Sequence, residues 1–259
     1  SPQGRRPQPK KKQQPNLRLA LAACVLVAVV ALVVIGLVAC NSGQKAPLTI
    51  DPGTSAGAWA KNDAGYYFNS DGEPILAATK KGIDVSKYQG EVDWEKAQAA
   101  GIDFAMIRCG YRTTVGGKVY EDANFKKNIE GALDAGVKVG IYFFSAAVNE
   151  TEVLEEAAFV IEVLKPYKDR ITYPVAYDFE ILGQDRAKNL TATAMTDHAI
   201  AYMDTIADAG YVPMLYASRN ALWNNWEMGR LSAYRVWLAQ YVNLLSQKRY
   251  NGAHVMWQC

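Results

Sequence analysis

Two acidic side chains stand two residues apart at the end of an apolar segment, residues 172–180. In an extended strand, Asp178 and Glu180 would point to the same side, with their backbone positions about 6.6 Å apart. Like charges this close resist simultaneous ionisation, so the pKa of one carboxyl should rise. A protonated acid beside an ionised carboxylate can cleave a glycosidic bond, because the acid protonates the leaving oxygen and the carboxylate stabilises the charge that develops on the sugar. We therefore predict a catalytic carboxylate pair in this segment.

A third acid, Asp84, has a similar setting in the segment 82–86. It stands between Ile83 and Val85, so its side chain points inward if the two apolar neighbours face covering helices. The acids of the segment 172–180 alternate with bulky apolar side chains in the same way. We expect Asp84 to orient the carboxylate pair by hydrogen bonding.

The elements that position these acids follow a regular order. Apolar segments predict strands near 82–86, 103–109, 137–144, 172–179, 211–217, 234–240 and 253–258, and helical patterns lie near 93–100, 122–135, 151–165 and 194–209. Three of the helices end in an Ala-Gly pair, at Gly101, Gly136 and Gly210, and a strand follows at once. Repeated strand–helix units indicate a parallel sheet. We predict an α/β fold, a modified TIM-like (β/α) barrel, with the acids at the carboxyl ends of its strands.

Six segments of the chain resemble, in order, glycoside hydrolase family 25, the Chalaropsis-type lysozymes. The resemblance begins near Gly82 and continues to the last residue. The segments are Gly82-Ile-Asp-Val-Ser-Lys-Tyr-Gln-Gly, Phe104-Ala-Met-Ile-Arg, Gly140-Ile-Tyr-Phe-Phe, Ala176-Tyr-Asp-Phe-Glu, Val236-Trp-Leu-Ala-Gln-Tyr and Met256-Trp-Gln. The resemblance implies hydrolysis of the β-1,4 bond between N-acetylmuramic acid and N-acetylglucosamine.

The resemblance also implies a role for particular residues. Glu180 resembles the general acid of the family. Asp178 resembles its partner carboxylate, which acts as nucleophile or steers the acetamido oxygen of the substrate. Asp84 resembles the supporting acid of the first strand. The sugar groove would be lined by Tyr142, Tyr216 and Trp237. Family members continue past Trp-Gln into a further strand, so we expect the domain 82–259 to be truncated at its C-terminus.

The N-terminal third of the chain has a different character. Residues 1–18 are basic, and Leu19 to Ala39 form an apolar segment of 21 residues, long enough to span a bilayer at about 1.5 Å per residue. We predict a basic cytoplasmic tail (1–18), a transmembrane anchor or lipoprotein signal (19–40) ending at the lipobox-like Cys40, and a flexible tether (41–81) with a short hairpin at Asp71-Gly72. Either form of anchor would place the barrel outside the cytoplasm, at a bacterial cell envelope.

Composition excludes several other classes of function. Seven of the 28 basic residues precede Asp51, the first acid, which leaves 21 bases and 26 acids in the rest of the chain. This acidic body argues against a nucleic-acid partner. There are only two histidines, His198 and His254, and no Cys-x-x-Cys pair, so we expect neither a metal nor another cofactor. The sequence leaves open whether Cys109 and Cys259 form a disulfide. The G-x-S-x-G pattern at 53–57 lacks the strand and helix of a nucleophile elbow.

Three functions are compatible with these observations. The first is a monomeric peptidoglycan hydrolase, tethered to a membrane and acting on glycan strands. The second is a catalytically weak or inactive membrane-anchored module that only binds peptidoglycan. The third is another barrel glycosidase, such as a chitinase, although those enzymes carry a longer run of acids and this chain has Pro174 and Ala176 before Asp178. Whether cleavage retains or inverts the anomeric configuration stays open, because it depends on the distance between the carboxyl groups.

Overall fold

The computed structural model describes residues 53–69, 72–181, 186–241 and 250–259. The predicted basic tail, the apolar segment 19–40 and the first part of the tether lie outside these ranges. Within them, no helix is both long and apolar enough to cross a membrane. The later part of the tether contains two short antiparallel strands, β1 (Tyr67–Phe68) and β2 (Pro74–Ile75).

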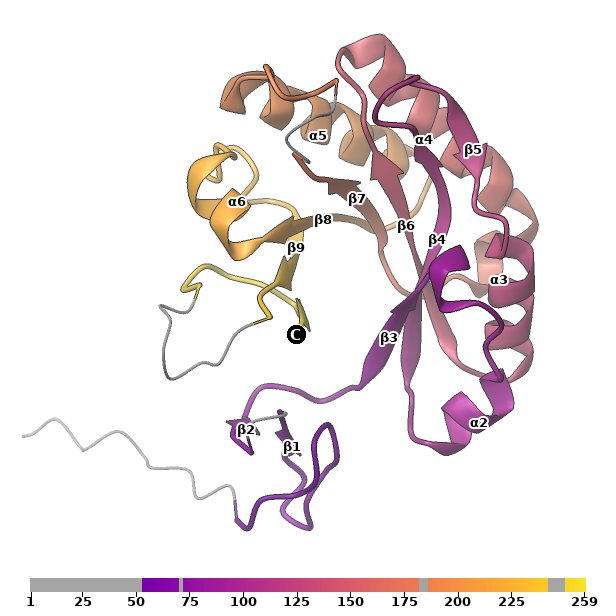
Figure 1. The fold of residues 1–259 in the computed structure, drawn as a ribbon, viewed down its shortest axis with the longest axis vertical. Helices are drawn as coiled ribbons and strands as arrows, with labels where there is room; N and C mark the ends of the chain where they lie inside the picture. Colours follow the sequence, from indigo (N-terminus) through magenta and orange to yellow (C-terminus); the bar gives the residue numbers. More distant parts are fainter. Residues whose placement is uncertain (1–52, 70–71, 182–185, 242–249) are drawn as a thin grey trace, which may run out of the picture. The chain divides into compact units, whose positions relative to one another are not determined.

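A curled sheet of seven parallel strands forms the centre of the barrel domain (Figure 1). All seven segments that were predicted as strands belong to it. Their order in the sheet is β3 (Gly82–Val85), β4 (Phe104–Arg112), β6 (Lys138–Ser145), β7 (Val175–Phe179), β8 (Pro213–Ser218), β9 (Arg235–Ala239) and β10 (Met256–Gln258). A short strand that was not predicted, β5 (Val119–Glu121), pairs antiparallel with β4. The arrangement confirms the α/β, TIM-like fold.

Helices cover the outer, convex face of this sheet (Figure 1). The four predicted helices are present as α2 (Trp94–Ala99), α3 (Phe125–Asp134), α4 (Glu150–Leu164) and α5 (Ala192–Asp208). Asn149 and Thr191 begin α4 and α5 by accepting a backbone N–H bond from the residue three positions later. Sequence patterns missed α6 (Arg219–Asn224) and the 3₁₀ helices η1 (Lys87–Gln89) and η2 (Lys165–Arg170), which are too short to show a hydrophobic period.

The alternation of side chains along the strands produces two separate apolar cores. Val175, Tyr177 and Phe179 of β7 point outward and are buried against the helices. Ala176 points inward, where it belongs to a smaller cluster with Met106 and Met214. These inward residues come from the amino-terminal halves of their strands. The inner core therefore fills one end of the curled sheet, while the carboxyl ends of the strands surround an open cleft.

A β-bulge changes the direction of side chains along β4. The pairing with β6 shifts between Arg108 and Gly110, which leaves Cys109 as the extra residue. Arg108, which precedes the bulge, faces the inside of the curled sheet, whereas Arg112, which follows it, faces outward and pairs with Glu156 of α4. Cys109 is a buried free thiol and Cys259 an exposed one, so the structure contains no disulfide between them.

Candidate active site

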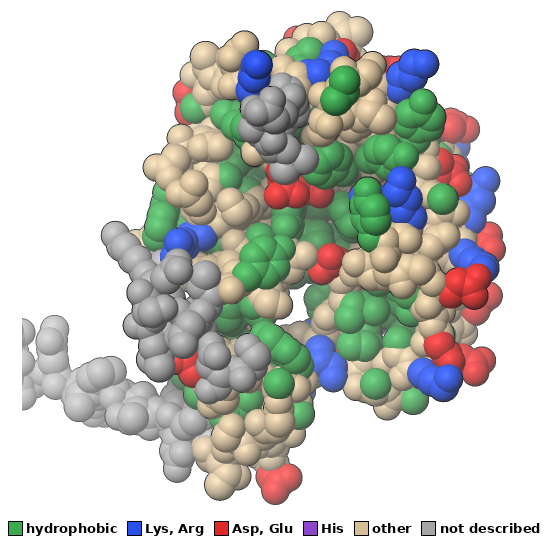
Figure 2. Space-filling model, viewed as in Figure 1, with side chains coloured by type: hydrophobic (Ala, Val, Ile, Leu, Met, Phe, Trp, Pro, Cys, Tyr) green, Lys and Arg blue, Asp and Glu red, His purple; other side chains and the backbone are tan. Residues whose placement is uncertain are grey.

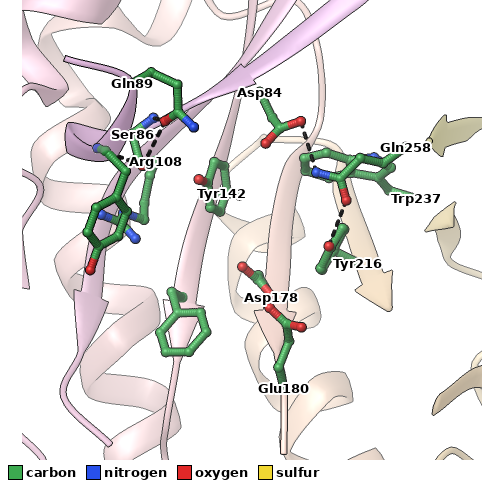
Figure 3. A pocket seen from close by; sticks show the side chains of 12 residues that line it. Asp84, Ser86, Gln89, Arg108, Tyr142, Asp178, Glu180, Tyr216, Trp237 and Gln258 are labelled. Carbon is green, nitrogen blue, oxygen red and sulfur yellow. Dashed lines mark hydrogen bonds between the residues drawn. The ribbon is translucent and has the colours of Figure 1, made fainter. Parts of the chain in front are cut away.

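A cleft of about 270 Å³ lies at the carboxyl ends of the parallel strands (Figure 3). Each of the seven parallel strands contributes a side chain to it, in the order Asp84, Arg108, Tyr142, Asp178, Tyr216, Trp237 and Gln258. Glu180 follows β7 directly and joins them. In Figure 2 this face of the molecule is hollowed near its centre, where acidic side chains lie among hydrophobic ones. The structure thus brings together all six residues that the sequence singled out as site candidates.

The carboxylate pair occupies the bottom of the cleft. Asp178 is only 5% exposed, and its Oδ1 has no hydrogen-bond partner among the described residues. Burial raises the pKa of Asp178 well above its usual value, the negative charges of Glu180 and Asp84 raise it further, and the positive charge of Arg108 opposes them. Burial also raises the pKa of Glu180, which is half-buried. The two groups together therefore retain a proton to a higher pH than exposed carboxyls do.

Asp84 is held by a glutamine from the opposite edge of the sheet. Gln258 donates from Nε2 to Asp84 Oδ2 at 2.9 Å, and its Oε1 accepts a bond from the Tyr216 hydroxyl at 2.7 Å (Figure 3). Among the described residues, Asp84 makes no hydrogen bond to Asp178 or Glu180, in contrast to the expectation, and it acts on Asp178 through its charge. The sequence included Gln258 in a family-like segment but gave no sign of its role.

Three aromatic side chains form one wall of the cleft. The ring of Trp237 contacts Tyr216 edge-on at a centroid distance of 4.7 Å and Tyr142 at 6.0 Å. Burial raises the pKa of both tyrosines, so their hydroxyls stay protonated and can donate hydrogen bonds. Flat rings beside hydroxyl donors suit a carbohydrate, which presents apolar ring faces and hydroxyl groups.

The side of the cleft opposite Trp237 and Tyr216 carries a cation, next to Tyr142, that sequence reasoning did not identify. Arg108 donates from Nε to Asp122 Oδ2 at 2.7 Å, and its guanidinium lies 5.0 Å from the ring centre of Tyr88. Asp122 is fully buried. The one signal for Arg108 in the sequence is its place in the segment Phe104-Ala-Met-Ile-Arg, where it would point inward together with Phe104 and Met106.

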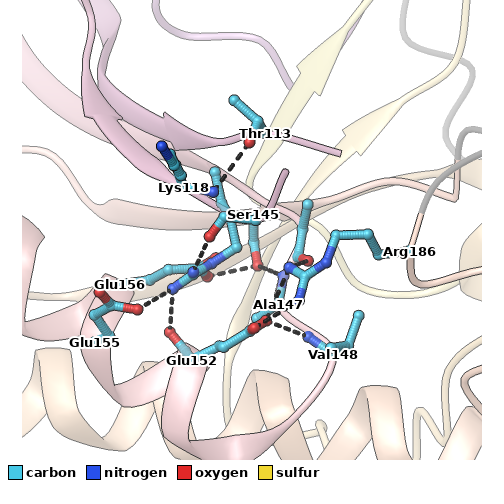
Figure 4. A network of polar contacts seen from close by, with 12 residues as sticks. Thr113, Lys118, Ser145, Ala147, Val148, Glu152, Glu155, Glu156 and Arg186 are labelled. Carbon is cyan, nitrogen blue, oxygen red and sulfur yellow. Dashed lines mark hydrogen bonds and ion pairs between the residues drawn. The ribbon is translucent and has the colours of Figure 1, made fainter. Parts of the chain in front are cut away.

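A buried polar network lies behind the strands that carry the pair (Figure 4). Arg112 donates to Glu156 Oε1 at 2.6 Å, and the hydroxyl of Ser145 donates to the other oxygen of Glu156 at 2.6 Å. Arg186, a few residues after Glu180, forms two hydrogen bonds with the carboxylate of Glu152, at 2.6 and 3.1 Å. These contacts attach the chain that follows the carboxylate pair to helix α4.

Known proteins with related sequences are lysozymes and a muramidase. The chain is 29% identical over 145 residues to the N,O-diacetylmuramidase of Arthroderma benhamiae, a match that covers 55% of this chain and 59% of that one. It is 25% identical over 162 residues to the autolytic lysozyme of Clostridium acetobutylicum, covering 62% and 45% of the two chains. A match to lysozyme M1 of Streptomyces globisporus, 29% identical, covers 41% and 35%. The matches therefore span between about a third and three fifths of these relatives.

Solved structures show the same fold. The modular autolysin LytC of Streptococcus pneumoniae, determined in complex with a synthetic peptidoglycan ligand, superposes with a TM-score of 0.65 at 26% identity, covering 78% of this chain and 48% of that one. A family 25 glycosyl hydrolase from Bacillus anthracis superposes with a TM-score of 0.57 at 20% identity, covering 80% and 84%. Residues 83–259, the greater part of the sequence, match the model of glycosyl hydrolases family 25. The chain therefore belongs to this family.

Proposed function

We propose that the chain is a muramidase, which hydrolyses the β-1,4 bond between N-acetylmuramic acid and N-acetylglucosamine in peptidoglycan. The observation that carries this proposal is the joint placement of Asp178 and Glu180 at the bottom of one cleft beside an aromatic wall. Family membership and the names of the muramidase and lysozyme relatives support the same reaction. A module that only binds peptidoglycan would have no need of a buried acid pair with raised pKa values.

In the proposed reaction Glu180 is the general acid. It is half-buried and burial raises its pKa, so it keeps a proton to a higher pH than an exposed glutamate does. That proton passes to the glycosidic oxygen as the bond from the anomeric carbon to this oxygen breaks. The reactive state of the pair carries the proton on Glu180 and the negative charge on Asp178, and the Arg108 charge favours this state. The ionised Asp178 then stabilises the positive charge on the sugar, as nucleophile or by steering the acetamido oxygen of the substrate. Water then adds its hydroxyl to the anomeric carbon and returns a proton to Glu180.

The remaining site residues receive supporting roles in this proposal. Trp237, Tyr216 and Tyr142 bind the sugar rings and their hydroxyl groups. Asp84 contributes negative charge beside Asp178 and is fixed by Gln258. Because all seven strands of one chain contribute to the cleft, we expect the protein to act as a monomer.

A substitution of Glu180 tests the catalytic assignment. Glu180→Gln should lower the rate at which purified cell walls are cleared by at least about 100-fold, because it removes the transferable proton. The matched control is Glu95→Gln on the exposed face of α2, which should clear walls like the wild type. Mass spectrometry of the fragments should find muramic acid at the reducing end. Equal clearing by Glu180→Gln and the wild type would refute the assignment.

We also propose that the chain is held at the outer side of a bacterial membrane by its residues 19–40. The support is the uncharged segment of 21 residues with a basic flank. The full chain should sediment with membranes and resist extraction by high salt. Its intact mass after detergent extraction separates an uncleaved anchor from a lipid-modified Cys40. Recovery of the full chain in the soluble fraction would contradict the proposal.

A further inference from the structure

One side of the cleft carries positive charge that the carboxylate pair does not neutralise. We call this surface the cationic wall, and define it as Tyr88 and Arg108, which line the cleft, together with Lys87 and Tyr111, which contact them from behind. The Arg108 guanidinium lies 5.0 and 5.2 Å from the ring centres of the two tyrosines, and Lys87 Nζ lies 5.4 and 4.9 Å from the same rings. Figure 3 shows Arg108 across the cleft from Trp237 and Tyr216, with Asp178 and Glu180 between the two sides.

The protein fixes Arg108 but leaves part of its guanidinium free. Nε and Nη2 both approach Oδ2 of Asp122, at 2.7 and 2.6 Å. The oxygens of Asp122 also accept bonds from the backbone N–H groups of Lys87 and Asn124. Within the described part of the chain, Nε makes the one hydrogen bond of this guanidinium, and the buried Nη2 contacts Asp122 as an ion pair without hydrogen-bond geometry. The guanidinium is therefore held in one orientation with donors left for a ligand.

Lys87 adds a second positive charge without a carboxylate partner. Its Nζ contacts the Tyr111 hydroxyl at 3.4 Å, and no acidic group of the described residues lies within ion-pair distance. The two cations of the wall face a single buried carboxylate, Asp122, so the wall carries an excess positive charge. An acidic substrate group would be attracted to this wall and repelled by Asp84, Asp178 and Glu180.

A carboxylate is the ligand group that best matches this geometry, because a fixed guanidinium donates to it through parallel hydrogen bonds. In peptidoglycan, the muramyl sugar carries a lactyl carboxyl group on C3, either free or extended by a peptide that ends in carboxylates. N-acetylglucosamine has no such group. We propose, on the basis of the muramidase function proposed above, that the cationic wall binds the carboxylate of the muramyl substituent. The wall thereby selects the muramyl sugar against glucosamine on that side of the carboxylate pair.

Two kinds of measurement test the wall. The first is kcat/KM on a chitin oligosaccharide, on peptide-free peptidoglycan strands and on peptide-bearing strands. The preference is the ratio of kcat/KM on muramyl strands to kcat/KM on chitin. This ratio should fall about threefold in Lys87→Met and roughly tenfold in Arg108→Gln. Lys138→Met is the matched control, because Lys138 is exposed at the amino end of β6 and should leave the preference unchanged.

The second measurement is binding, followed by tryptophan fluorescence, of N-acetylmuramic acid, muramyl dipeptide and N-acetylglucosamine. It keeps the inference testable if the muramidase activity itself fails. The thermal melting of each variant is compared first, because Arg108→Gln leaves the buried Asp122 without its cation. Lys87→Met leaves the ion pair between Arg108 and Asp122 intact. The difference in muramyl binding between this variant and the wild type should become smaller in high salt.

The outcomes separate the wall from the reaction. Weaker binding of N-acetylmuramic acid by Lys87→Met assigns the ligand to the lactyl carboxylate, and weakening only for muramyl dipeptide assigns it to the peptide carboxylate. Either supports the wall, even if no glycan is cleaved and the proposed function is wrong. Unchanged muramyl binding and unchanged preference in both Lys87→Met and Arg108→Gln would overturn the inference, whether or not the wild type cleaves peptidoglycan.

Discussion

Asp178 occupies a position that favours the neutral form of a carboxyl group. It is almost completely buried, one of its oxygens has no hydrogen-bond partner in the described structure, and two other acids line the same cleft. Burial, Glu180 and Asp84 raise its pKa, and only the Arg108 charge works against them. A group of this kind is costly to ionise in the folded state, so it reduces stability while it provides a proton-binding site.

This residue-scale argument predicts that Asp178→Asn is more stable than the wild type at neutral pH. The folded pKa of Asp178 lies above its unfolded value, so the folded wild type loses stability as pH rises from the unfolded towards the folded pKa. The difference in melting temperature should be positive at pH 7 and should shrink as pH falls below 4. A lower melting temperature for Asp178→Asn at pH 7 would show that the ionised carboxylate is stabilised.

At the scale of elements, the ion pair between β4 and α4 fixes the outer layer against the sheet. Arg112 and Glu156 are both buried, and Glu156 also accepts the hydroxyl of Ser145 (Figure 4). Burial raises the pKa of Glu156 to about 7, although the bonds from Ser145 and Arg112 lower it. Arg112 also pairs with Glu155, whose side chain is 62% exposed.

The two glutamates of this ion-pair group offer a direct comparison. Glu156→Ala should lower the free energy of unfolding by about 3–5 kcal/mol, because it leaves Arg112 buried without its buried carboxylate partner. Glu155→Ala should cost less than about 1 kcal/mol, since water screens and replaces the exposed carboxylate. Urea denaturation of the two variants measures both values. Equal losses of unfolding free energy in the two variants would contradict the assignment of Arg112 and Glu156 as the buried ion pair.

The turn between β4 and β5 supports the segment that follows the carboxylate pair. Gly117 has a φ of +65°, and a Cβ atom on it would lie 2.5 Å from Nη1 of Arg186. Gly117→Ala should therefore cost about 1–2 kcal/mol of stability and displace Arg186 from Glu152, with a lower kcat. Gly116→Ala is the control, because its Cβ would meet its nearest neighbour at 3.4 Å. The idea fails if the two alanine variants have the same stability and kcat.

At the scale of the whole barrel domain, the two edge strands of the sheet are joined by side chains. In the described structure β3 and β10 share no backbone pairing, and the bond from Gln258 to Asp84 connects them. The same glutamine accepts a bond from Tyr216, so one side chain links three strands across the cleft. The shape of the cleft therefore depends on Gln258.

Replacing this glutamine tests the connection. Gln258→Leu should lower the free energy of unfolding by about 1–3 kcal/mol, because Asp84 and the Tyr216 hydroxyl lose a partner. We also expect a higher KM for glycan strands, since the aromatic wall is no longer held to β3. Gln98→Leu, on the exposed surface of α2, provides the comparison. Wild-type stability and KM in Gln258→Leu would exclude a linking role.

Much of this arrangement could be predicted from the sequence, because periodicity determines which residues of a regular strand face inward. The alternation around Asp178 and Asp84 gave their positions at the carboxyl ends of β7 and β3. The contributions of Arg108 and Gln258 could not be predicted, because they depend on pairing between distant segments. The bulge at Cys109 and the short helix η1 also have no periodic signature, although both determine which groups line the cleft.

The bulge in β4 has a consequence for variation in this protein. If β4 paired with β6 without this bulge, its side chains would alternate strictly, and Arg112 would then turn into the sugar cleft. Glu156 would be left in the outer core without a cation, and Tyr111 would leave the cationic wall. Such a shift of pairing would thus damage folding and substrate recognition together, whereas deletion of Cys109, the extra residue, would keep Gly110 opposite Phe143 and leave both arginines in their present directions. The pairing register, more than chemical identity, is the property that this strand must preserve.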